Sequence, residues 1–168
     1  YDNFGMTETE TDGNDHATRY EYEDTHTFPL RITNAKAQPT EYSYDLATGN
    51  LLSTTDANGF TAAFEFDDFA RITKEIRPLD SSQSPTKTYI YSFDGSAPEH
   101  IVEWQKDQHD GRSIIYVYDG FGKFIQQRKS TDAQQVALNI FYDPFDRVRK
   151  VNNPAFENSV NGYQQPAV

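Results

Sequence analysis

The amino-acid sequence predicts an all-β protein made of tandem β-hairpins. An aromatic residue followed by an acidic or polar residue and a turn recurs seven times along the 168 residues. Aromatic residues also stand two positions before most of these starts, and a period of two is typical of a strand with one patterned face. No amphipathic run of helix length interrupts the pattern. We therefore expect one continuous antiparallel sheet that twists and coils into a spiral as strands are added.

The seven starts define a repeat. They are Tyr1, Tyr22, Tyr44, Phe66, Tyr91, Tyr118 and Tyr142. Successive starts are separated by 21, 22, 22, 25, 27 and 24 residues. Such a period is typical of arrays whose units are too small to bury their own apolar face and pack on their neighbours. Residues 1–168 are thus predicted to form one array of about seven repeats, with an irregular tail at 154–168. Because no strand precedes the first start, we expect a piece of a longer repeat protein.

The strand that leads up to each repeat start is predicted to end at that start residue. The aromatic pairs at the strand ends are Tyr20/Tyr22, Tyr42/Tyr44, Phe64/Phe66, Tyr89/Tyr91 and Tyr116/Tyr118, with Ile140/Tyr142 as a looser copy. Alternation places both members of a pair on one face of the sheet, and each ring can bury a large area. We expect a buried structural ladder whose members are Tyr22, Tyr44, Phe66, Tyr91, Tyr118 and Tyr142. Replacing Tyr118 with alanine would then remove about 3–5 kcal/mol of stability.

The residue after each start is predicted to nucleate a turn. The acids at this position include Asp45, Asp67, Asp119 and Asp143. An aspartate side chain accepts a hydrogen bond from the backbone amide two residues on, which favours a turn. Gly49 and Gly122 follow and can adopt a positive φ without strain. Ala70 and Asp146 stand where other copies have glycine, so we expect a different φ there.

A second turn lies about midway through each repeat. Its copies begin at Asp12, Asn34, Asp56 and Asp132, each preceded by threonine. Asn58-Gly59 is a strong hairpin signal because both residues tolerate the left-handed region. Each repeat is therefore predicted to read strand, turn, strand, turn, which pairs the strands antiparallel.

Composition excludes several classes of function. The net charge is −11, from 15 basic and 26 acidic residues, which argues against a nucleic-acid partner and against an anionic membrane surface. There is no cysteine, so disulfides and thiolate metal sites are excluded. No apolar stretch approaches the length of a transmembrane segment, and we expect no membrane insertion.

The motif as a set resembles the YD-repeat or Rhs family. Its most complete copy runs Tyr118-Asp119-Gly120-Phe121-Gly122-Lys123, with lysine where the family usually has arginine. The segment 28–35, Phe-Pro-Leu-Arg-Ile-Thr-Asn-Ala, is similar to an inter-repeat stretch in the B component of bacterial Tc toxin complexes. The resemblance covers nearly the whole chain.

The resemblance implies a spiral sheet wound into a hollow shell that encloses a toxic C-terminal polypeptide. The chain is then expected to be a non-enzymatic wall segment that encapsulates a toxin or effector polypeptide for secretion or delivery. Its partners would be the neighbouring YD repeats of the parent chain and the encapsulated polypeptide, in a secreted, extracellular or bacterial cell-surface protein. The self-cleaving core segment of the family has no full match, and Asp143-Pro144 is a lone dipeptide inside a repeat.

Two other functions are kept as alternatives. A surface adhesin or a glycan- or protein-binding repeat module would use exposed aromatic residues, for which Trp104 and Tyr89 are the candidates. Packing of Trp104 on the ladder is the simpler expectation. A self-processing or hydrolytic enzyme would need two carboxyls with separated pKa values in a cleft. Asp67 with Asp68 is such a pair in sequence, but an acid that recurs at every turn is more simply structural.

No cofactor or metal is expected from the sequence. The acidic loops at 12–15 and 107–110 offer oxygen ligands for calcium but lack the EF-hand spacing, and turn hydrogen bonding is the simpler explanation of them. The histidines are His16, His26, His100 and His109, and none forms a His-x-x-x-His pair. The least regular stretches, 78–85 and 107–111, are where a partner-specific loop is expected.

Overall fold

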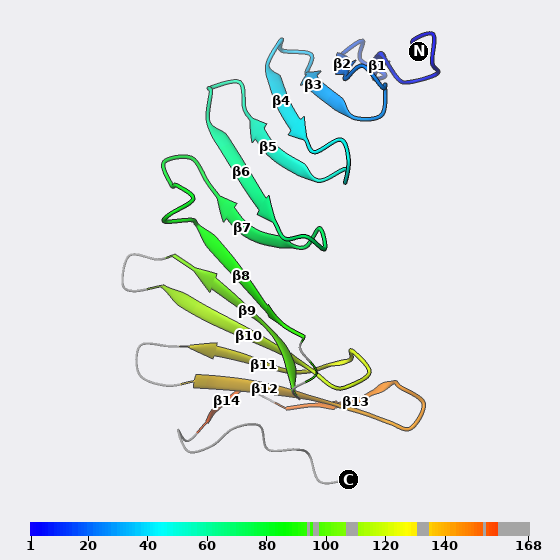
Figure 1. Ribbon diagram of the computed structural model, residues 1–168. Helices are drawn as coiled ribbons and strands as arrows, with labels where there is room; N and C mark the ends of the chain where they lie inside the picture. The colour runs from blue at the N-terminus through cyan, green and yellow to red at the C-terminus, as the bar shows by residue number, and fades with distance from the viewer. Residues whose placement is uncertain (94, 96–97, 107–110, 131–134, 153, 158–168) are drawn as a thin grey trace. The chain divides into compact units, whose positions relative to one another are not determined.

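The computed structural model describes residues 1–168 except 94, 96–97, 107–110, 131–134, 153 and 158–168. It divides into two compact units, Tyr1–Thr86 and Lys87–Val168, called unit 1 and unit 2 below. Both are built from successive antiparallel hairpins, and the described residues contain no helix (Figure 1). The predicted all-β class, with tandem antiparallel hairpins, is confirmed.

Unit 1 contains seven strands whose order in the sheet follows the chain. They are β1 (Thr9–Thr11), β2 (Ala17–Tyr22), β3 (Pro29–Thr33), β4 (Pro39–Tyr44), β5 (Leu51–Thr55), β6 (Thr61–Phe66) and β7 (Ile72–Ile76). Every neighbouring pair is antiparallel. β2, β4 and β6 end at an aromatic start, as the sequence predicts.

The described residues of unit 2 form the remaining seven strands. They are β8 (Lys87–Ser92), β9 (Glu99–Gln105), β10 (Arg112–Tyr118), β11 (Phe124–Ser130), β12 (Gln135–Tyr142), β13 (Val148–Val151) and β14 (Ala155–Glu157). β13 pairs with residues 140–142 of β12, and β14 pairs with residues 135–137 of the same strand. Because β14 lies within 154–168, the predicted irregular tail is strand over three of its residues.

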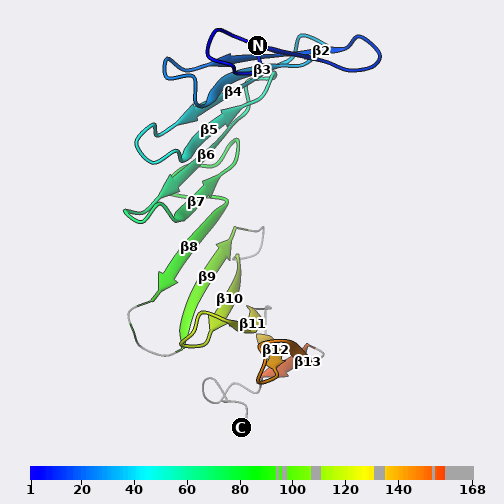
Figure 2. The ribbon, with the colours of Figure 1, turned by 90° about the vertical axis from the view of Figure 1, so that its right-hand side faces the viewer.

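A β-bulge accompanies each strand that ends at an aromatic start. Phe66 pairs with Ile72 and Glu65 pairs with Lys74, which leaves Thr73 as an extra residue on β7. The same shift of register occurs next to Tyr22, Tyr44, Tyr118 and Tyr142. Bulges of this kind increase the right-handed twist locally. The strand direction accordingly turns step by step from β2 to β7 (Figure 2).

The buried core is small. Within each unit the described strands form a single layer (Figure 1). Among the described residues, Val117 (2% exposed) and Ala137 (4%) are the buried hydrophobic side chains. Both belong to unit 2, where Val117 pairs with His100 and Gln126 and Ala137 pairs with Arg128.

In the part of the chain that is described, no helix has the length and apolarity that a membrane crossing requires.

Candidate functional site

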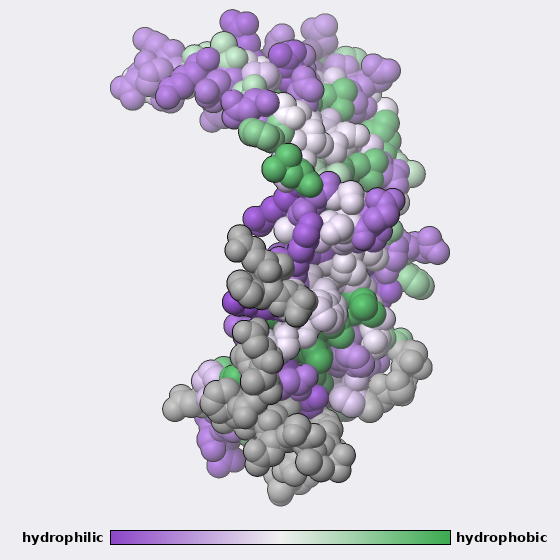
Figure 3. Space-filling view, turned by 90° about the vertical axis from the view of Figure 1, so that its left-hand side faces the viewer, coloured by the Kyte–Doolittle hydropathy of each residue, from purple (hydrophilic) through white to green (hydrophobic). Residues whose placement is uncertain are grey.

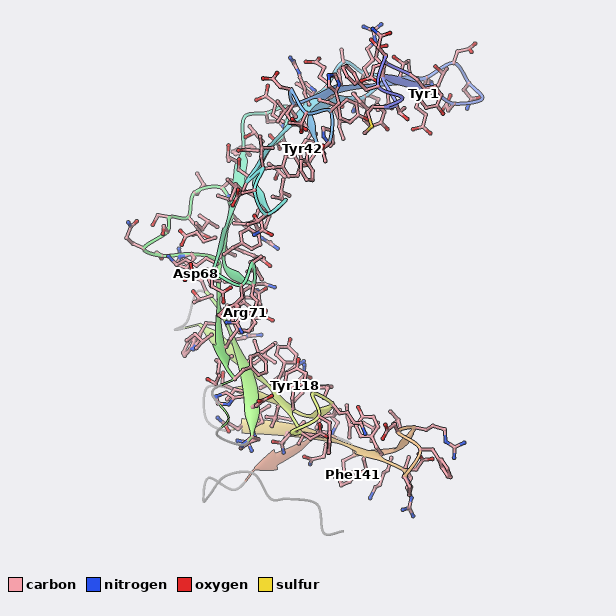
Figure 4. The ribbon with its side chains drawn as sticks, turned by 45° about the vertical axis from the view of Figure 1, so that its right-hand side comes forward. Tyr1, Tyr42, Asp68, Arg71, Tyr118 and Phe141 are labelled. Carbon is pink, nitrogen blue, oxygen red and sulfur yellow. The ribbon has the colours of Figure 1, made fainter. Side chains whose placement is uncertain are left out.

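The strand register brings the aromatic pairs of unit 1 to one side of the sheet, called the aromatic face below. Tyr42 lies opposite Thr54, and Thr54 lies opposite Ala62, so these residues share a face. Alternation adds Tyr44 and the Phe64/Phe66 pair to it. In unit 2, Tyr91 pairs with Ile101 and Ile101 with Tyr116, which builds the equivalent face. Tyr42 and Tyr118 are labelled in Figure 4.

The ladder is half-buried rather than buried. All six predicted members, Tyr22, Tyr44, Phe66, Tyr91, Tyr118 and Tyr142, have intermediate exposure. The expectation of a buried ladder is therefore wrong, because a single-layer sheet leaves one side of each ring accessible to solvent.

Aromatic residues that follow the turns complete the ladder. The ring of Phe28 stacks on Tyr44 with centroids 4.8 Å apart. In unit 2, the Phe124 ring lies 5.9 Å from Tyr118 and 6.0 Å from Tyr116. The sequence alone did not identify Phe28 and Phe124 as members of the ladder. Each stands five residues after the turn acid, a position that could have identified them.

Two ladder tyrosines use their hydroxyls to tie the chain to an earlier turn. The Tyr22 hydroxyl donates to the Thr7 carbonyl at 2.9 Å, and the Tyr142 hydroxyl donates to the Phe124 carbonyl at 2.8 Å. Each acceptor lies five residues after the acid of the preceding aromatic-start turn. A tyrosine at these positions therefore ties its strand to the segment that follows the preceding turn, in a way that phenylalanine cannot.

The turn after each aromatic start, called a major turn below, is closed by its acid. Asp67 Oδ1 accepts the backbone amides of Phe69 and Arg71, each at 3.0 Å. The Ala70 amide donates to the Asp67 carbonyl at 2.9 Å. The same pair of amide bonds occurs at Asp2, Asp119 and Asp143, and Asp45 accepts from the amide of Ala47.

The midway turns, called minor turns below, have the same geometry. Asp56 Oδ1 accepts the amides of Asn58 and Phe60, each at 2.9 Å. Asp12 and Asn34 do the same. From Asp12 onward, the acceptor residues of unit 1 follow one another at positions 12, 23, 34, 45, 56 and 67, a spacing of 11 residues. The structural period is thus half the sequence period, because only alternate turns follow an aromatic start.

The closing hydrogen bonds impose a positive φ whether or not glycine is present. Gly49 and Gly122 have φ of 77° and 78°, as expected. Ala70 and Asp146 have φ of 59° and 65°, so the expectation of a different conformation there is wrong. The left-handed conformation disfavours residues with a Cβ. The acid's three hydrogen bonds to the turn outweigh that preference.

Arginine reinforces two of the major turns. The Arg71 side chain donates to Asp67 Oδ2 from Nε at 2.8 Å and approaches it with a terminal nitrogen at 2.7 Å. That hydrogen bond, followed by those from the backbone amides, lowers the pKa of Asp67 against the opposing effect of burial. In the turn of Asp143, the Arg147 amide and then its guanidinium lower the pKa of the carboxyl.

The paired acids of this turn do not form a matched acid and base. Asp67 uses both carboxylate oxygens within the turn, whereas Asp68 is exposed. General acid–base chemistry needs both carboxyls in one cleft with separated pKa values. The geometry at Asp67 instead supports a structural role.

Glu23 stands where the other major turns have aspartate. Its longer side chain accepts the Thr25 hydroxyl and the Thr27 amide, each at 2.6 Å, and the Phe28 amide at 3.1 Å. Glu23 is 6% exposed. The Thr25 hydroxyl and these amides hold the pKa of Glu23 at about 2, below its ordinary 4.5, although burial opposes them. The turn therefore needs an ionised carboxylate.

The low pKa of Glu23 predicts that unit 1 loses stability in acid. Because the folded pKa lies below the unfolded one, Glu23 stabilises the fold above about pH 4.5, and this contribution is lost as the pH falls toward about 2. In Glu23→Gln, hydrogen exchange of the β2–β3 hairpin should be faster than in the unchanged protein at pH 6. The difference should disappear near pH 2, after correction for the intrinsic exchange rate. Asp24→Asn, an exposed neighbour, is the control and should match the unchanged protein at both pH values. A difference that persists at pH 2 would contradict the role of the carboxylate charge.

The histidines serve local contacts. His26 Nδ1 lies 2.9 Å from Asp2 Oδ2, and its ring stacks on Phe4 at 4.0 Å. His16 Nδ1 lies 3.0 Å from Asp12 Oδ2, and His100 contacts the Pro98 carbonyl.

The loop 12–15 uses its oxygen ligands within the turn. There, Asp12 Oδ1 already accepts two amides and Oδ2 contacts His16. Among the described residues, no group of three or more His, Cys, Asp or Glu side chains could hold a metal ion. The loop 107–110 and His109 lie outside the described residues.

Trp104 and Tyr89 do not form a shared platform. Trp104 pairs with Thr88, whereas Tyr89 pairs with Glu103, so alternation puts the two rings on opposite faces. Trp104 is 46% exposed and lies against Gly111, away from the aromatic face. Both expectations for Trp104, a platform with Tyr89 or packing on the ladder, are therefore wrong.

A buried ion pair in unit 2 had no signal in the sequence. Glu103 is 8% exposed on the aromatic face, with Lys87 Nζ at 3.1 Å from its carboxylate. The Tyr116 hydroxyl donates to Glu103 at 3.2 Å. Burial and then the Glu103 charge raise the pKa of Tyr116. The equivalent positions in other strands, opposite the first aromatic residue of each pair, include Thr54, Glu75 and Gln127, so a polar residue there does not stand out in the sequence.

The irregular stretch 78–85 folds back onto the other face of unit 1. Ser82 Oγ contacts both Lys74 Nζ, at 2.9 Å, and Glu65 Oε1, at 2.5 Å. Lys74 Nζ also pairs with Glu65 Oε2 at 2.7 Å. The loop is thus anchored to β6 and β7, with Leu79 at its exposed tip.

Comparison with known families finds a match to part of the chain. Residues 44–82 match the family model described as RHS Repeat, so an RHS repeat is present there. The match spans two major turns and the minor turn between them. No curated protein matches the chain.

Proposed function

We propose that this chain is a non-enzymatic wall segment of an RHS-repeat shell that encloses a toxin or effector polypeptide for secretion or delivery. The observation that carries the proposal is the half-buried aromatic face of a single-layer sheet. Among the described residues, no large side chain is fully buried, and the rings of the aromatic face keep intermediate exposure. Such a surface is stabilised when another polypeptide covers it.

The turns support a structural rather than a catalytic role. Each described turn acid accepts hydrogen bonds from its own turn, and the same arrangement recurs every 11 residues in unit 1. A recurring device of this kind sets the hairpin geometry and leaves the faces of the sheet free for contact. The proposed partners are the adjoining repeats of the parent chain and an enclosed polypeptide, in a secreted or bacterial cell-surface protein.

The test uses the parent chain. Limited proteolysis should leave its C-terminal segment intact while the repeat region is folded, and negative-stain images of the same sample should show hollow particles. Mild denaturant that opens the particle should expose the same segment to cleavage. An open or solid particle with an exposed C-terminal segment would contradict encapsulation. Exposed Trp104 would then justify a glycan-binding screen, as for an adhesin.

A further inference from the structure

The acid of a major turn can hold a side chain besides its backbone amides, and in two turns that side chain comes from the same turn. In the turns of Asp67 and Asp143, Oδ1 accepts the amides and Oδ2 accepts Nε of an arginine at 2.8 Å. This arginine is the fourth residue after the acid. The minor turn of Asp12 is similar, because the Nδ1 atom of its fourth residue, His16, lies 3.0 Å from Asp12 Oδ2. These three turns are closed by their own residues.

The turn of Asp2 receives the equivalent contact from the next major turn. Its own fourth residue is Met6, whose side chain has no hydrogen to donate. Asp2 Oδ1 accepts the Phe4 and Met6 amides at 2.9 and 2.8 Å. Asp2 Oδ2 lies 2.9 Å from Nδ1 of His26, whose ring stacks on Phe4 with centroids 4.0 Å apart. His26 belongs to the turn of Glu23, so the contact joins two consecutive major turns.

This contact is better shielded from solvent than an ordinary surface pair. Hydrophilic residues predominate on the side of unit 1 that faces the viewer in Figure 3, and exposed ion pairs contribute little to stability. The side chains of His26 and Asp2 are 32% and 19% exposed. Those of His16 and Asp12 in the minor turn are 65% and 51% exposed. The half-buried pair with its stacked ring is therefore the stronger contact of the two.

His26 also occupies a backbone position where other major turns have glycine. It is the third residue after its acid and has a φ of 54°. Gly5 and Gly122 stand at this position in two other major turns. Ala70 shares the conformation, with a φ of 59°, but its exposed methyl group offers no polar contact. Histidine thus adopts a conformation that disfavours a Cβ, and gains a contact that neither glycine nor alanine can make.

Unit 2 contains a second contact between consecutive major turns. Lys123 is the fourth residue after Asp119, the position that arginine holds in the two turns above. Its ammonium group pairs with Asp146, the third residue after the acid of the following turn, where φ is 65°. The hydrogen bond to Asp146 raises the pKa of Lys123 above its ordinary value, although partial burial opposes it. Lysine at 123 and aspartate at 146 both depart from the repeat, and they contact each other.

The difference between arginine and lysine accounts for the turn that each one contacts. In Arg71, Nε and a terminal nitrogen both approach Asp67 Oδ2, at 2.8 and 2.7 Å. A lysine side chain has no donor at the position of Nε, and its ammonium group stands at the end of a flexible chain. The Lys123 ammonium accordingly lies over the Tyr142 ring of the next repeat, 5.8 Å from its centroid. Arginine therefore suits a contact within its own turn, and lysine suits a contact with the turn that follows.

We propose that the His26–Asp2 and Lys123–Asp146 contacts are clasps that join consecutive major turns, and that the fourth residue after the turn acid determines where a clasp forms. Arginine there closes a turn on itself. Methionine leaves the second oxygen of the acid to the next turn, and lysine reaches the next turn directly. Turns are among the least stable parts of a sheet, so a clasp restrains a region that the backbone ladder does not hold. This role is independent of what the repeats enclose.

Amide hydrogen exchange measured by NMR tests the clasp in unit 1. His26→Gly relieves the left-handed conformation but removes the clasp, so the Gly5 and Met6 amides should exchange at least about threefold faster. Ala70→Gly is the matched control, because it relieves the same conformation and removes no polar contact. It should slow exchange of the Arg71 amide about twofold to fivefold. Unchanged or slower exchange of Gly5 and Met6 in His26→Gly would overturn the proposal. Faster exchange in both variants would overturn it as well, because glycine itself would then loosen the turns.

Met6→Arg tests the role of the fourth residue. The new guanidinium should bind Asp2 Oδ2 in place of His26. In this background His26→Gly should therefore change exchange of the Gly5 amide by less than about 1.5-fold. Met6→Leu keeps an apolar side chain and should leave the full effect of His26→Gly in place. An undiminished effect in the Met6→Arg background would contradict the proposed role of this position.

The side chain of Lys123 gives a separate readout in unit 2. Its pKa, followed by NMR titration of the ammonium group, should fall toward the ordinary lysine value in Asp146→Asn. The same substitution should speed exchange of the Gly122 amide about twofold. In Lys123→Arg the guanidinium should bind Asp119, and Asp146→Asn should then leave that exchange unchanged. A Lys123 pKa that does not move, or an equal effect of Asp146→Asn in both backgrounds, would overturn the clasp of unit 2.

Discussion

Replacing Tyr118 with alanine is expected to lower the free energy of unfolding of unit 2 by about 2–3 kcal/mol. The Tyr118 ring lies between Phe93, at 6.2 Å, and Phe124, at 5.9 Å, so its removal opens a gap in the ladder. The effect is below that of a fully buried aromatic residue because Tyr118 is half-buried. Urea denaturation followed by Trp104 fluorescence gives the value, since the single tryptophan lies in unit 2.

Two neighbouring substitutions are the controls for Tyr118. Tyr118→Phe keeps the ring and should change the stability by less than about 0.5 kcal/mol. Phe121→Ala removes a ring that is 91% exposed and should have a similarly small effect. A loss below about 1 kcal/mol in Tyr118→Ala would show that the ladder does not stabilise unit 2.

The second large effect is expected at Glu103. Glu103→Ala leaves Lys87 and the Tyr116 hydroxyl without their carboxylate partner on a partly desolvated face. Removing one member of a buried ion pair typically costs about 3–5 kcal/mol, and the partial exposure of Lys87 reduces the expected loss to about 2–3 kcal/mol. The same fluorescence-detected denaturation measures it.

A double substitution distinguishes the ion pair from simple loss of packing. Glu103→Leu with Lys87→Met replaces both charges by apolar groups of similar size. It should be more stable than Glu103→Leu alone, because the unpaired ammonium group is then absent. Stability losses that simply add in the double variant would show that the two side chains do not interact energetically.

Local sequence patterns predicted the fold well because the interactions that form its strand ends and turns are local. The strand ends at Tyr44, Phe66 and Tyr118 follow from alternation. The turn hydrogen bonds of Asp67 and Asp143 follow from aspartate chemistry within five residues. Each strand end and each turn is encoded in a short segment that recurs along the chain. The antiparallel hairpin order could therefore be predicted without knowledge of long-range contacts.

The features that the sequence did not predict correctly share a different cause, which is pairing between strands. Which face Trp104 occupies depends on the register of β9 against β8, and a shift of one residue would reverse it. The burial of Glu103 depends on Lys87 and Tyr116 from neighbouring strands. The degree of burial of Tyr118 depends on the absence of a second layer over the described strands, which no short segment records.

The equal 11-residue spacing of turn acceptors in unit 1 also bears on how such a chain can change in length during evolution. A duplication of one strand and one turn would leave every hydrogen bond of the flanking turns intact. It would nevertheless move all later aromatic starts to the opposite edge, because successive turns alternate between edges. A duplication of two strands and two turns restores both the edge and the face of every later residue. Growth by hairpins, rather than by single strands, is therefore the step that lets the array lengthen without altering the surfaces it presents.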